Sequence, residues 1–322
     1  MGRKSLARAL SSGSYSRPPQ NRYIARFAQQ LLTPMESSIL TDIFLPASLF
    51  VIMLGMGLSL VVADFRRVFA FPKAAAIGLT NQLLVVPLVS FGLCHVFALP
   101  NELAIGMMLI AACPGGVTSN LISHVSRGDT ALSISLTAMS SLITLVTIPL
   151  FVGFAFRYFN DTGKAVDVDE LGMVLQILVI VIIPVAMGMV IRARSEAFAR
   201  RMDRPVRIFS VVLFVAIVVS IVIREWETIV GYFPQIGGAT VTLNVLTLLL
   251  GYYSAILFRL RPKQAITIAI ESGIQNGTLA IVIAATVLAD FTLSIPAGIY
   301  SLIMFISGGV IMYWFGRERG LR

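Results

Sequence analysis

A single carboxylate lies in the middle of an apolar stretch near the C-terminal end of the chain. The stretch reads ITIAIESGIQNGTLAIVIAATV, and Glu271 is its only acidic residue. Two amides and two glycines follow it closely: Gln275, Asn276, Gly273 and Gly277. An ionisable group deep in a membrane segment is costly and usually functional. We therefore expect Glu271 to bind an ion or to carry a proton.

Uncharged oxygen donors elsewhere in the chain could complete a cation site around Glu271. They are the side chains of Gln82, Ser119, Asn120, Ser133, Thr137, Gln275 and Asn276. Ser133 and Thr137 are four residues apart, so on a helix they share one face. One carboxylate among neutral oxygens suits a monovalent hard cation such as Na⁺ better than Ca²⁺, which usually takes several carboxylates. A protonated Glu271 that exchanges H⁺ is the alternative.

A second polar interruption, CPGGVTSN, occurs in an earlier apolar segment. Pro114 has no amide hydrogen and the two glycines after it tolerate non-helical backbone, so we expect the helix to unwind at 114–116. Residues 104–113 before the break can form about 15 Å of helix, roughly half a bilayer. A single break of this kind would indicate a kink. Two at matching places are typical of the midplane site of a secondary transporter.

The elements that must hold these residues are membrane helices. Of the 322 residues, 57% are hydrophobic and 13% are charged, and the mean hydropathy is +0.87. Soluble domains carry about 25% charged residues. Apolar runs of roughly 17–25 residues, the length that spans a bilayer, predict an all-α integral membrane protein with about nine transmembrane helices. The predicted ranges are 41–62, 74–98, 104–125, 130–156, 171–191, 208–223, 239–258, 264–289 and 297–315.

The basic residues predict the orientation of these spans, because short cytoplasmic loops are enriched in Lys and Arg. One set of alternate connections holds sixteen of them, and the other set holds Arg157, Lys164 and Arg224. We therefore expect the C-terminus in the cytoplasm and the protein in the cell (inner) membrane of a bacterium. The net charge of +9 is then mainly a signal of topology, and no nucleic acid is expected as a partner.

Residues 1–38 form a basic extension that we expect to be disordered, ahead of a transporter domain at 39–322. The first 35 residues hold six Lys or Arg and no acid. A basic segment resists export, which conflicts with the outside N-terminus that nine spans require. A true N-terminus, an organelle-targeting segment and a start-site artefact with translation from Met35 are the three alternatives.

The two breaks divide the spans into two similar units. Spans five to nine form a five-helix unit that is broken at its fourth member, and spans one to four form the same unit if its first helix is missing. An odd number of helices per unit makes the two copies opposite in orientation. We therefore expect inverted repeats, the first at about 41–156 and the second at about 171–315.

CPGGVTSNLISHVSRGDTALSISLT and ESGIQNGTLA resemble the broken-helix regions of the bile acid:sodium symporter family, and GMGLSL followed by DF resembles its early segment. The resemblance covers about residues 45–315. It implies a panel domain, a core domain with two crossing broken helices, and two sodium ions. The first sodium site then falls on Ser119, Asn120, Ser133, Thr137 and Glu271. The second falls on Gln82, Glu271 and Gln275 with the backbone carbonyls of Ser272 and Ile274.

The resemblance also implies an organic anion as substrate: a bile acid, pantoate or another carboxylate. N-termini of half-helices carry partial positive charge, so we place the carboxylate at Val117, Thr118 and Asn276. Val117 stands where bacterial relatives often have a hydroxyl residue, and Met304 and Phe305 stand where relatives often have His and Asn. We therefore expect a more apolar pocket in this chain, and the resemblance does not fix the substrate.

Together these patterns predict a sodium-coupled secondary active symporter of an organic anion that works by alternating access, and not an enzyme. A proton-coupled or efflux transporter of the same fold is the alternative. An intramembrane hydrolase is a distant one, since Ser119 or Ser133 would have to pair with His124 and no acid partner or catalytic motif accompanies them. The expected partners are the anion, two Na⁺ and the lipid bilayer, and no protein partner is inferred.

Overall fold

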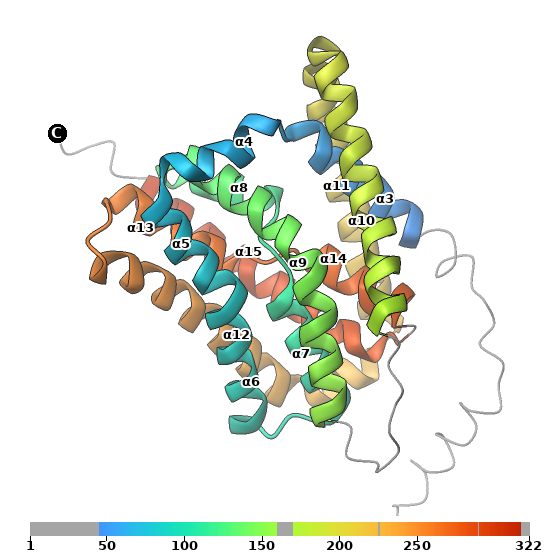
Figure 1. The fold of residues 1–322 in the computed structure, drawn as a ribbon. Coiled ribbons are helices and arrows are strands. Elements are labelled where there is room, and N and C mark those ends of the chain that lie inside the picture. Colours follow the sequence, from blue (N-terminus) through green and yellow to red (C-terminus); the bar gives the residue numbers. More distant parts are fainter. Residues whose placement is uncertain (1–44, 160–169, 225, 289, 317–322) are drawn as a thin grey trace, which may run out of the picture. The chain divides into compact units, whose positions relative to one another are not determined.

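The computed structural model describes residues 45–159, 170–224, 226–288 and 290–316, so the basic extension at 1–38 lies outside the described residues. Helices form almost all of this part of the chain, and it contains no β-strand. Figure 1 shows the elements in sequence colours: α3 (Leu45–Ser59), α4 (Val62–Arg67), η2 (Val68–Ala70), α5 (Pro72–Thr80), η3 (Asn81–Val85), α6 (Val86–Val96), α7 (Asn101–Ala112), α8 (Val117–Val125), α9 (Thr130–Phe159), α10 (Glu170–Arg194), α11 (Glu196–Arg224), α12 (Trp226–Leu257), α13 (Pro262–Gly273), α14 (Gly277–Val282), η4 (Ile283–Val287), η5 (Thr292–Ser294) and α15 (Ile295–Gly316).

Helices lie over all nine predicted ranges. Within the described part of the chain, two bent helix pairs and five single segments are long and apolar enough to cross a membrane. The five segments are Pro72–Val96, Thr130–Phe159, Phe233–Leu257, Pro262–Val287 and Thr292–Gly316. The protein is therefore an all-α membrane protein with five to seven such spans by length and composition, and the number nine stays a prediction.

The first bent pair is a feature that the sequence did not predict, because one continuous span was expected there. α3 and α4 meet at an angle of 67°. At the end of α3, the Leu58 carbonyl accepts a hydrogen bond of 3.2 Å from the Arg192 guanidinium of α10. At the start of α4, the Asp64 carboxylate accepts one of 2.9 Å from the Val61 amide. Both bonds satisfy backbone groups that helix ends leave free, and the first depends on a helix that is distant in sequence.

Both predicted helix breaks are present. The chain unwinds at 113–116 between α7 and α8, which meet at 61°, and at 274–276 between α13 and α14. The two breaks meet, because the Asn276 amide donates a hydrogen bond of 2.8 Å to the Pro114 carbonyl. Unwound backbone at membrane depth must find its partners inside the protein, so this bond holds the two breaks against each other where the broken helices cross.

Glycines bring α3 and α10 close together. A Cβ atom on Gly57 would overlap the Val185 carbonyl group, and one on Gly188 would overlap the Leu54 carbonyl oxygen. Small residues that allow such a close approach are typical of interfaces between membrane helices. Because α11 packs on α3 and α10 as well, we call α3, α10 and α11 the three-helix group.

The other helices pack around the two breaks. α7 contacts α6, α9 and α15, and α12 contacts α13 and α15. Fully buried apolar side chains such as Met107, Leu109 and Ile281 fill the space between them. We call α6 to α9 and α12 to α15 the core group. It contains both breaks and faces the three-helix group.

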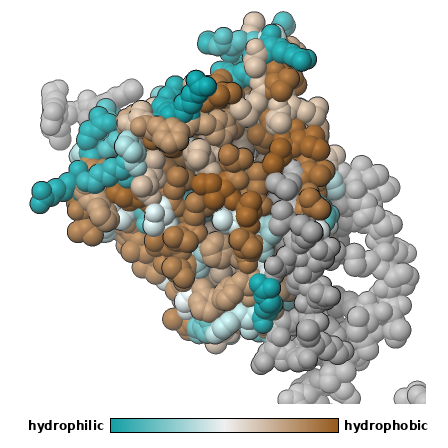
Figure 2. Space-filling view, in the orientation of Figure 1, coloured by the Kyte–Doolittle hydropathy of each residue, from teal (hydrophilic) through white to brown (hydrophobic). Residues whose placement is uncertain are grey.

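Apolar side chains cover much of the outside of the helices. Leu88, Val146 and Ile306, for example, are 65%, 53% and 70% exposed. On the face shown in Figure 2, apolar side chains make up most of the visible described surface, and polar side chains gather toward its edges. An apolar surface of this extent is unfavourable in water, and it fits contact with lipid.

Candidate functional site

The side chain of Glu271 is buried where α13 meets α8 and α9. Its Oε1 accepts a hydrogen bond of 2.5 Å from the Ser133 hydroxyl, and its Oε2 accepts one of 2.9 Å from the Thr137 hydroxyl. The Asn120 Oδ1 lies 2.8 Å from the Ser133 Oγ and 3.2 Å from the Thr137 Oγ1. Four of the five residues predicted for the first ion are therefore in direct contact. We call these four residues and Ser119 the Glu271 cluster.

Gly115 leaves space beside the carboxylate. A Cβ atom on Gly115 would lie 2.6 Å from the Glu271 Oε2 and 3.2 Å from the Ser119 Oγ. The Ser119 side chain is buried, and its hydroxyl donates a hydrogen bond of 2.7 Å to the Gly116 carbonyl. Ser119, the fifth predicted ligand, thus lies near the carboxylate with its hydrogen directed to the backbone.

The Glu271 cluster has more oxygen acceptors than hydroxyl hydrogens. A hydroxyl has a single hydrogen, and those of Ser133 and Thr137 are each shared between the Glu271 carboxylate and the Asn120 oxygen. An oxygen-rich set with one negative charge can hold a small hard cation. In the described ranges no group of three or more His, Cys, Asp or Glu side chains could hold a metal ion.

Gln82 and Gln275 lie next to each other at the crossing. Gln82 belongs to η3, a π-helical turn of a kind that is frequent at functional sites. Its Nε2 donates hydrogen bonds of 2.8 Å to the Gln275 Oε1 and to the Cys113 carbonyl. The Gln275 Nε2 donates one of 2.8 Å to the Ser272 carbonyl. Three residues predicted for the second ion are therefore joined by hydrogen bonds.

In this arrangement, amide hydrogens occupy oxygens that were predicted to bind the second ion. The Glu271 carboxylate, which the prediction shares between the two ions, is hydrogen-bonded within its own cluster. Ile274 is buried in the second break, and its amide still donates 2.8 Å to the Ile270 carbonyl. For a cation to bind here, the amides of Gln82 and Gln275 would have to turn so that their oxygens face it.

The end of α13 is held by two residues to which the sequence reasoning gave no role in the site. The Gly273 carbonyl accepts hydrogen bonds of 2.8 Å from the Asn244 Nδ2 and 2.9 Å from the Tyr300 hydroxyl. Asn244 and Tyr300 lie in the predicted spans 239–258 and 297–315, and neither was among the predicted ligands. The pairing depends on how α12 and α15 pack on α13, so no local pattern in the sequence reveals it.

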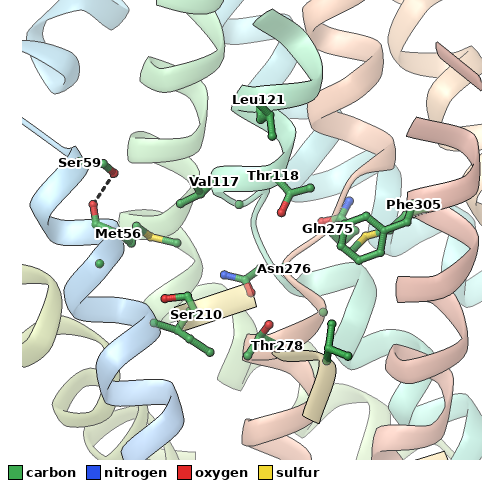
Figure 3. A pocket seen from close by; sticks show the side chains of 16 residues that line it. Met56, Ser59, Val117, Thr118, Leu121, Ser210, Gln275, Asn276, Thr278 and Phe305 are labelled. Carbon is green, nitrogen blue, oxygen red and sulfur yellow. Dashed lines mark hydrogen bonds between the residues drawn. The ribbon is translucent and has the colours of Figure 1, made fainter. Parts of the chain in front are cut away.

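A cavity of about 260 Å³ lies between the core group and the three-helix group. Figure 3 shows that Val117, Thr118 and Asn276, the residues predicted to contact the anion, surround it. The Asn276 Oδ1 accepts a hydrogen bond of 3.0 Å from the Leu279 amide and so caps α14. The nitrogen end of the Asn276 side chain points into the cavity (Figure 3).

Apolar side chains form most of the cavity wall. They include Met56 of α3, Val215 of α11, and Met304 and Phe305 of α15. None of the described residues that line the cavity is an Arg, Lys, His, Asp or Glu. An anion bound here would therefore rely on amide and hydroxyl hydrogens and on the N-terminus of α8.

The hydroxyls proposed for the hydrolase alternative have other partners. Ser119 donates to a backbone carbonyl, and Ser133 contacts Asn120 and Glu271. His124 is exposed, and its Nδ1 lies 3.3 Å from the Thr130 hydroxyl. These contacts do not assemble a nucleophile and base.

Comparison with known proteins places these features in context. The family model described as the Sodium Bile acid symporter family matches residues 46–232. The chain is 29% identical to an uncharacterized sodium-dependent transporter, YocS, of Bacillus subtilis, over 82% of this chain and 80% of that protein. It is 30% identical to the hepatic sodium/bile acid cotransporter of Homo sapiens, over 73% of this chain and 67% of that protein. It is 28% identical to a probable chloroplastic sodium/metabolite cotransporter, BASS2, of Oryza sativa subsp. japonica, over 87% of this chain and 65% of that protein.

Proposed function

Because the chain belongs to the Sodium Bile acid symporter family, we propose that it is a secondary active symporter that moves an organic anion together with two sodium ions. The relatives are named as sodium-dependent transporters and cotransporters, so the chain is a sodium-coupled transporter and not an enzyme. The observation that carries the proposal is the buried Glu271 carboxylate with its hydroxyl and amide oxygens.

The first sodium ion binds in the Glu271 cluster, and the second binds beside the second break. The second ion takes the carbonyls of Ser272 and Ile274 with the side-chain oxygens of Gln82 and Gln275, and Glu271 supplies negative charge for both ions. Sodium replaces the hydrogen bond of 2.8 Å between the two glutamine amides. Binding of the second ion therefore turns these amides and orders the second break.

The substrate is a small organic anion, such as a bile acid, pantoate or another carboxylate. Its carboxylate binds at the N-terminus of α8, near Val117 and Thr118, and at the amide of Asn276. A helix N-terminus favours negative charge because its first amides lack partners within the helix. The rest of the substrate lies along apolar residues such as Met304 and Phe305, which line the same cavity.

Transport proceeds by alternating access. The cavity has α3 and α11 on one side and α8, α14 and α15 on the other, so a movement of the core group against the three-helix group changes the side to which it opens. Sodium binds first and orders both breaks, which the bond from Asn276 to Pro114 links. The ordered breaks then form the anion site.

We place the protein in the cell inner membrane with its C-terminus in the cytoplasm. Basic residues meet at one end of the core group: Arg127 lies 3.4 Å from the Gly316 carbonyl at the end of α15, and Arg261 lies 3.7 Å from the Asp129 carboxylate. Cytoplasmic connections are enriched in Lys and Arg, which supports this orientation.

The test is the loss of sodium dependence in Glu271→Ala. Purified protein is titrated with sodium, with choline as the replacement cation, and the midpoint temperature of unfolding is followed because a ligand that binds the native state raises it. Uptake of radioactive glycocholate and pantoate, which both carry a carboxylate, into proteoliposomes is then measured with each cation. The parent should show sodium-dependent stabilisation, and Glu271→Ala should lose it together with sodium-dependent uptake.

Glu102→Ala is the matched control, because Glu102 is an exposed acidic residue in the first turn of α7. It should keep the parental response. Sodium-dependent uptake that persists in Glu271→Ala would contradict the mechanism. Uptake by the parent that follows a pH gradient and ignores sodium would favour the proton-coupled alternative.

A further inference from the structure

A second set of polar side chains lies one helical turn away from the Glu271 cluster, on the same three elements. Each of three cluster residues has a counterpart four positions away: Ser123 after Ser119 on α8, Thr267 before Glu271 on α13, and Asp129, the residue directly before α9, ahead of Ser133. Positions four apart share a helix face and are separated by about 6 Å along the axis. All three counterparts lie on the side of the Glu271 cluster that faces the end of the core group with Arg127 and Arg261.

The three counterparts form one connected layer. The Ser123 Oγ lies 2.9 Å from the Thr267 Oγ1, and the Thr267 Oγ1 accepts a hydrogen bond of 2.8 Å from the Asp129 amide. Ser123 and Thr267 are completely buried, whereas the Asp129 side chain is 16% exposed. The Asp129 carboxylate accepts a hydrogen bond of 3.2 Å from the Leu132 amide at the start of α9, and it lies 3.7 Å from the exposed Arg261 guanidinium. Asp129 therefore joins the buried pair of hydroxyls through its backbone, and its carboxylate lies nearer the surface.

A further hydroxyl group follows directly after α8. Ser119 and Ser123 share one face of α8 because they are four residues apart, and Ser126 is the residue that caps the C-terminal end of this helix. Ser126 is completely buried, and its hydroxyl has no hydrogen-bond partner within the residues that the structure describes. A buried polar group without a partner is unfavourable and requires an explanation.

A structural role explains part of this arrangement. A Cβ atom on Gly128 would lie 2.6 Å from both the Ser123 Oγ and the Thr267 Oγ1, so the connection between α8 and α9 packs tightly on the two hydroxyls. Their hydrogen bonds thus tie this connection to α13. Such a role does not require that the polar side chains continue from the Glu271 cluster toward Asp129 along all three segments. It also does not explain why the Ser126 hydroxyl has no partner among the described residues.

We propose that Ser123, Thr267 and Asp129 form a transient sodium site through which the ion leaves the Glu271 cluster toward the cytoplasmic end. This inference rests on the proposed function. Hydroxyl and carboxylate oxygens are suitable ligands for a hard cation, and a step of about 6 Å takes the ion from one oxygen set to the next. The hydrogen bond between Ser123 and Thr267 opens to admit the ion. Arg261 repels the ion at Asp129 and so prevents it from staying.

The test separates the rate of sodium movement from sodium affinity. Thr267→Val keeps the shape of the side chain and removes its oxygen, while Thr267→Ser keeps the oxygen. Exchange of radioactive sodium across proteoliposomes is measured together with equilibrium sodium affinity, taken from the sodium dependence of thermal unfolding. In Thr267→Val, exchange should slow by about tenfold, and affinity should stay at the parental value because the Glu271 cluster is intact. Thr267→Ser should exchange at the parental rate.

Thr242→Val is the matched control, because the Thr242 hydroxyl on α12 donates only to the Gly238 carbonyl of its own helix among the described contacts. It should leave both quantities unchanged. If Thr267→Val does not fold, Ser123→Ala replaces it with the same expected slowing. Parental exchange in the variant, an equal slowing in Thr267→Ser, or a parallel loss of equilibrium affinity would overturn the release site. A parent without sodium-dependent stabilisation would refute the proposed function itself.

Discussion

Replacing Gly115 by alanine should weaken sodium binding while the protein stays folded. A Cβ atom there would lie 2.6 Å from the Glu271 Oε2, and ordinary contact begins at 3.4 Å, so this oxygen has to move by about 0.8 Å. The oxygen is the far end of a flexible side chain. The methyl group can therefore be accommodated by a movement of the carboxylate, without a shift of the backbone.

The displacement affects an oxygen that we expect to hold the ion. The Thr137 hydroxyl donates to the same oxygen at 2.9 Å, and a shift of this size along the bond would lengthen it beyond hydrogen-bonding distance. An extra methyl group in a well-packed site costs about 1–3 kcal/mol, which corresponds to roughly 5- to 150-fold in affinity. We expect the sodium dissociation constant of Gly115→Ala to rise within this range.

Sodium affinity is read from the midpoint temperature of unfolding as sodium replaces choline at constant ionic strength. Gly116→Ala is the matched control, because a Cβ atom on Gly116 would meet nothing closer than 3.9 Å. A change below about 0.5 kcal/mol, typical of substitutions without new contacts, would keep its affinity close to the parental value. Parental affinity in Gly115→Ala, or an equal loss in Gly116→Ala, would refute the reasoning.

Two further predictions concern the second break, and both are measured as thermal stability in detergent. Asn244→Leu and Tyr300→Phe should each lower the free energy of unfolding by about 1 kcal/mol, because the Gly273 carbonyl keeps its other donor. The double variant should lower the free energy of unfolding by more than the sum of the two single variants, because the Gly273 carbonyl then has neither donor. Additive effects would contradict the view that the two side chains share this acceptor. Gly277→Ala should be destabilising, since its Cβ atom would overlap the Ser301 Oγ and displace this hydroxyl from its hydrogen bond of 2.7 Å to the Ala297 carbonyl. Adding Ser301→Ala to Gly277→Ala should recover most of the lost stability. If stability is not recovered, the overlap with Ser301 is not the cause of the destabilisation.

The parts of the fold with local signals were accessible from the sequence. Pro114 with the glycines after it predicted the first break, since proline and glycine act on the backbone at their own position. The types and spacing of Ser133 and Thr137 pointed to one helix face, and the structure brings both to Glu271. In these cases, residue chemistry and helix geometry were sufficient.

Features that depend on packing between distant segments were not accessible in this way. The bend between α3 and α4 involves Arg192, which lies more than 130 positions from the Leu58 carbonyl it contacts. The space beside Glu271 depends on Gly115, whose sequence context indicates only a flexible backbone. The resemblance named Gln82 and Gln275 as ligands, but it did not predict the hydrogen bond between their amides. Such contacts arise when elements are brought together, and no single segment encodes them.

The hydrogen bond between the two breaks has a consequence for how the protein is made. Pro114 leaves the ribosome about half a chain length before Asn276, which supplies the amide for its carbonyl. An unpaired backbone group in the bilayer costs several kcal/mol, so the first broken helix stays incomplete during most of membrane insertion. A nascent chain that stops before α13 would lack the Asn276 amide and leave the Pro114 carbonyl without this partner. Maturation of the N-terminal half thus waits for the last part of the chain to be inserted.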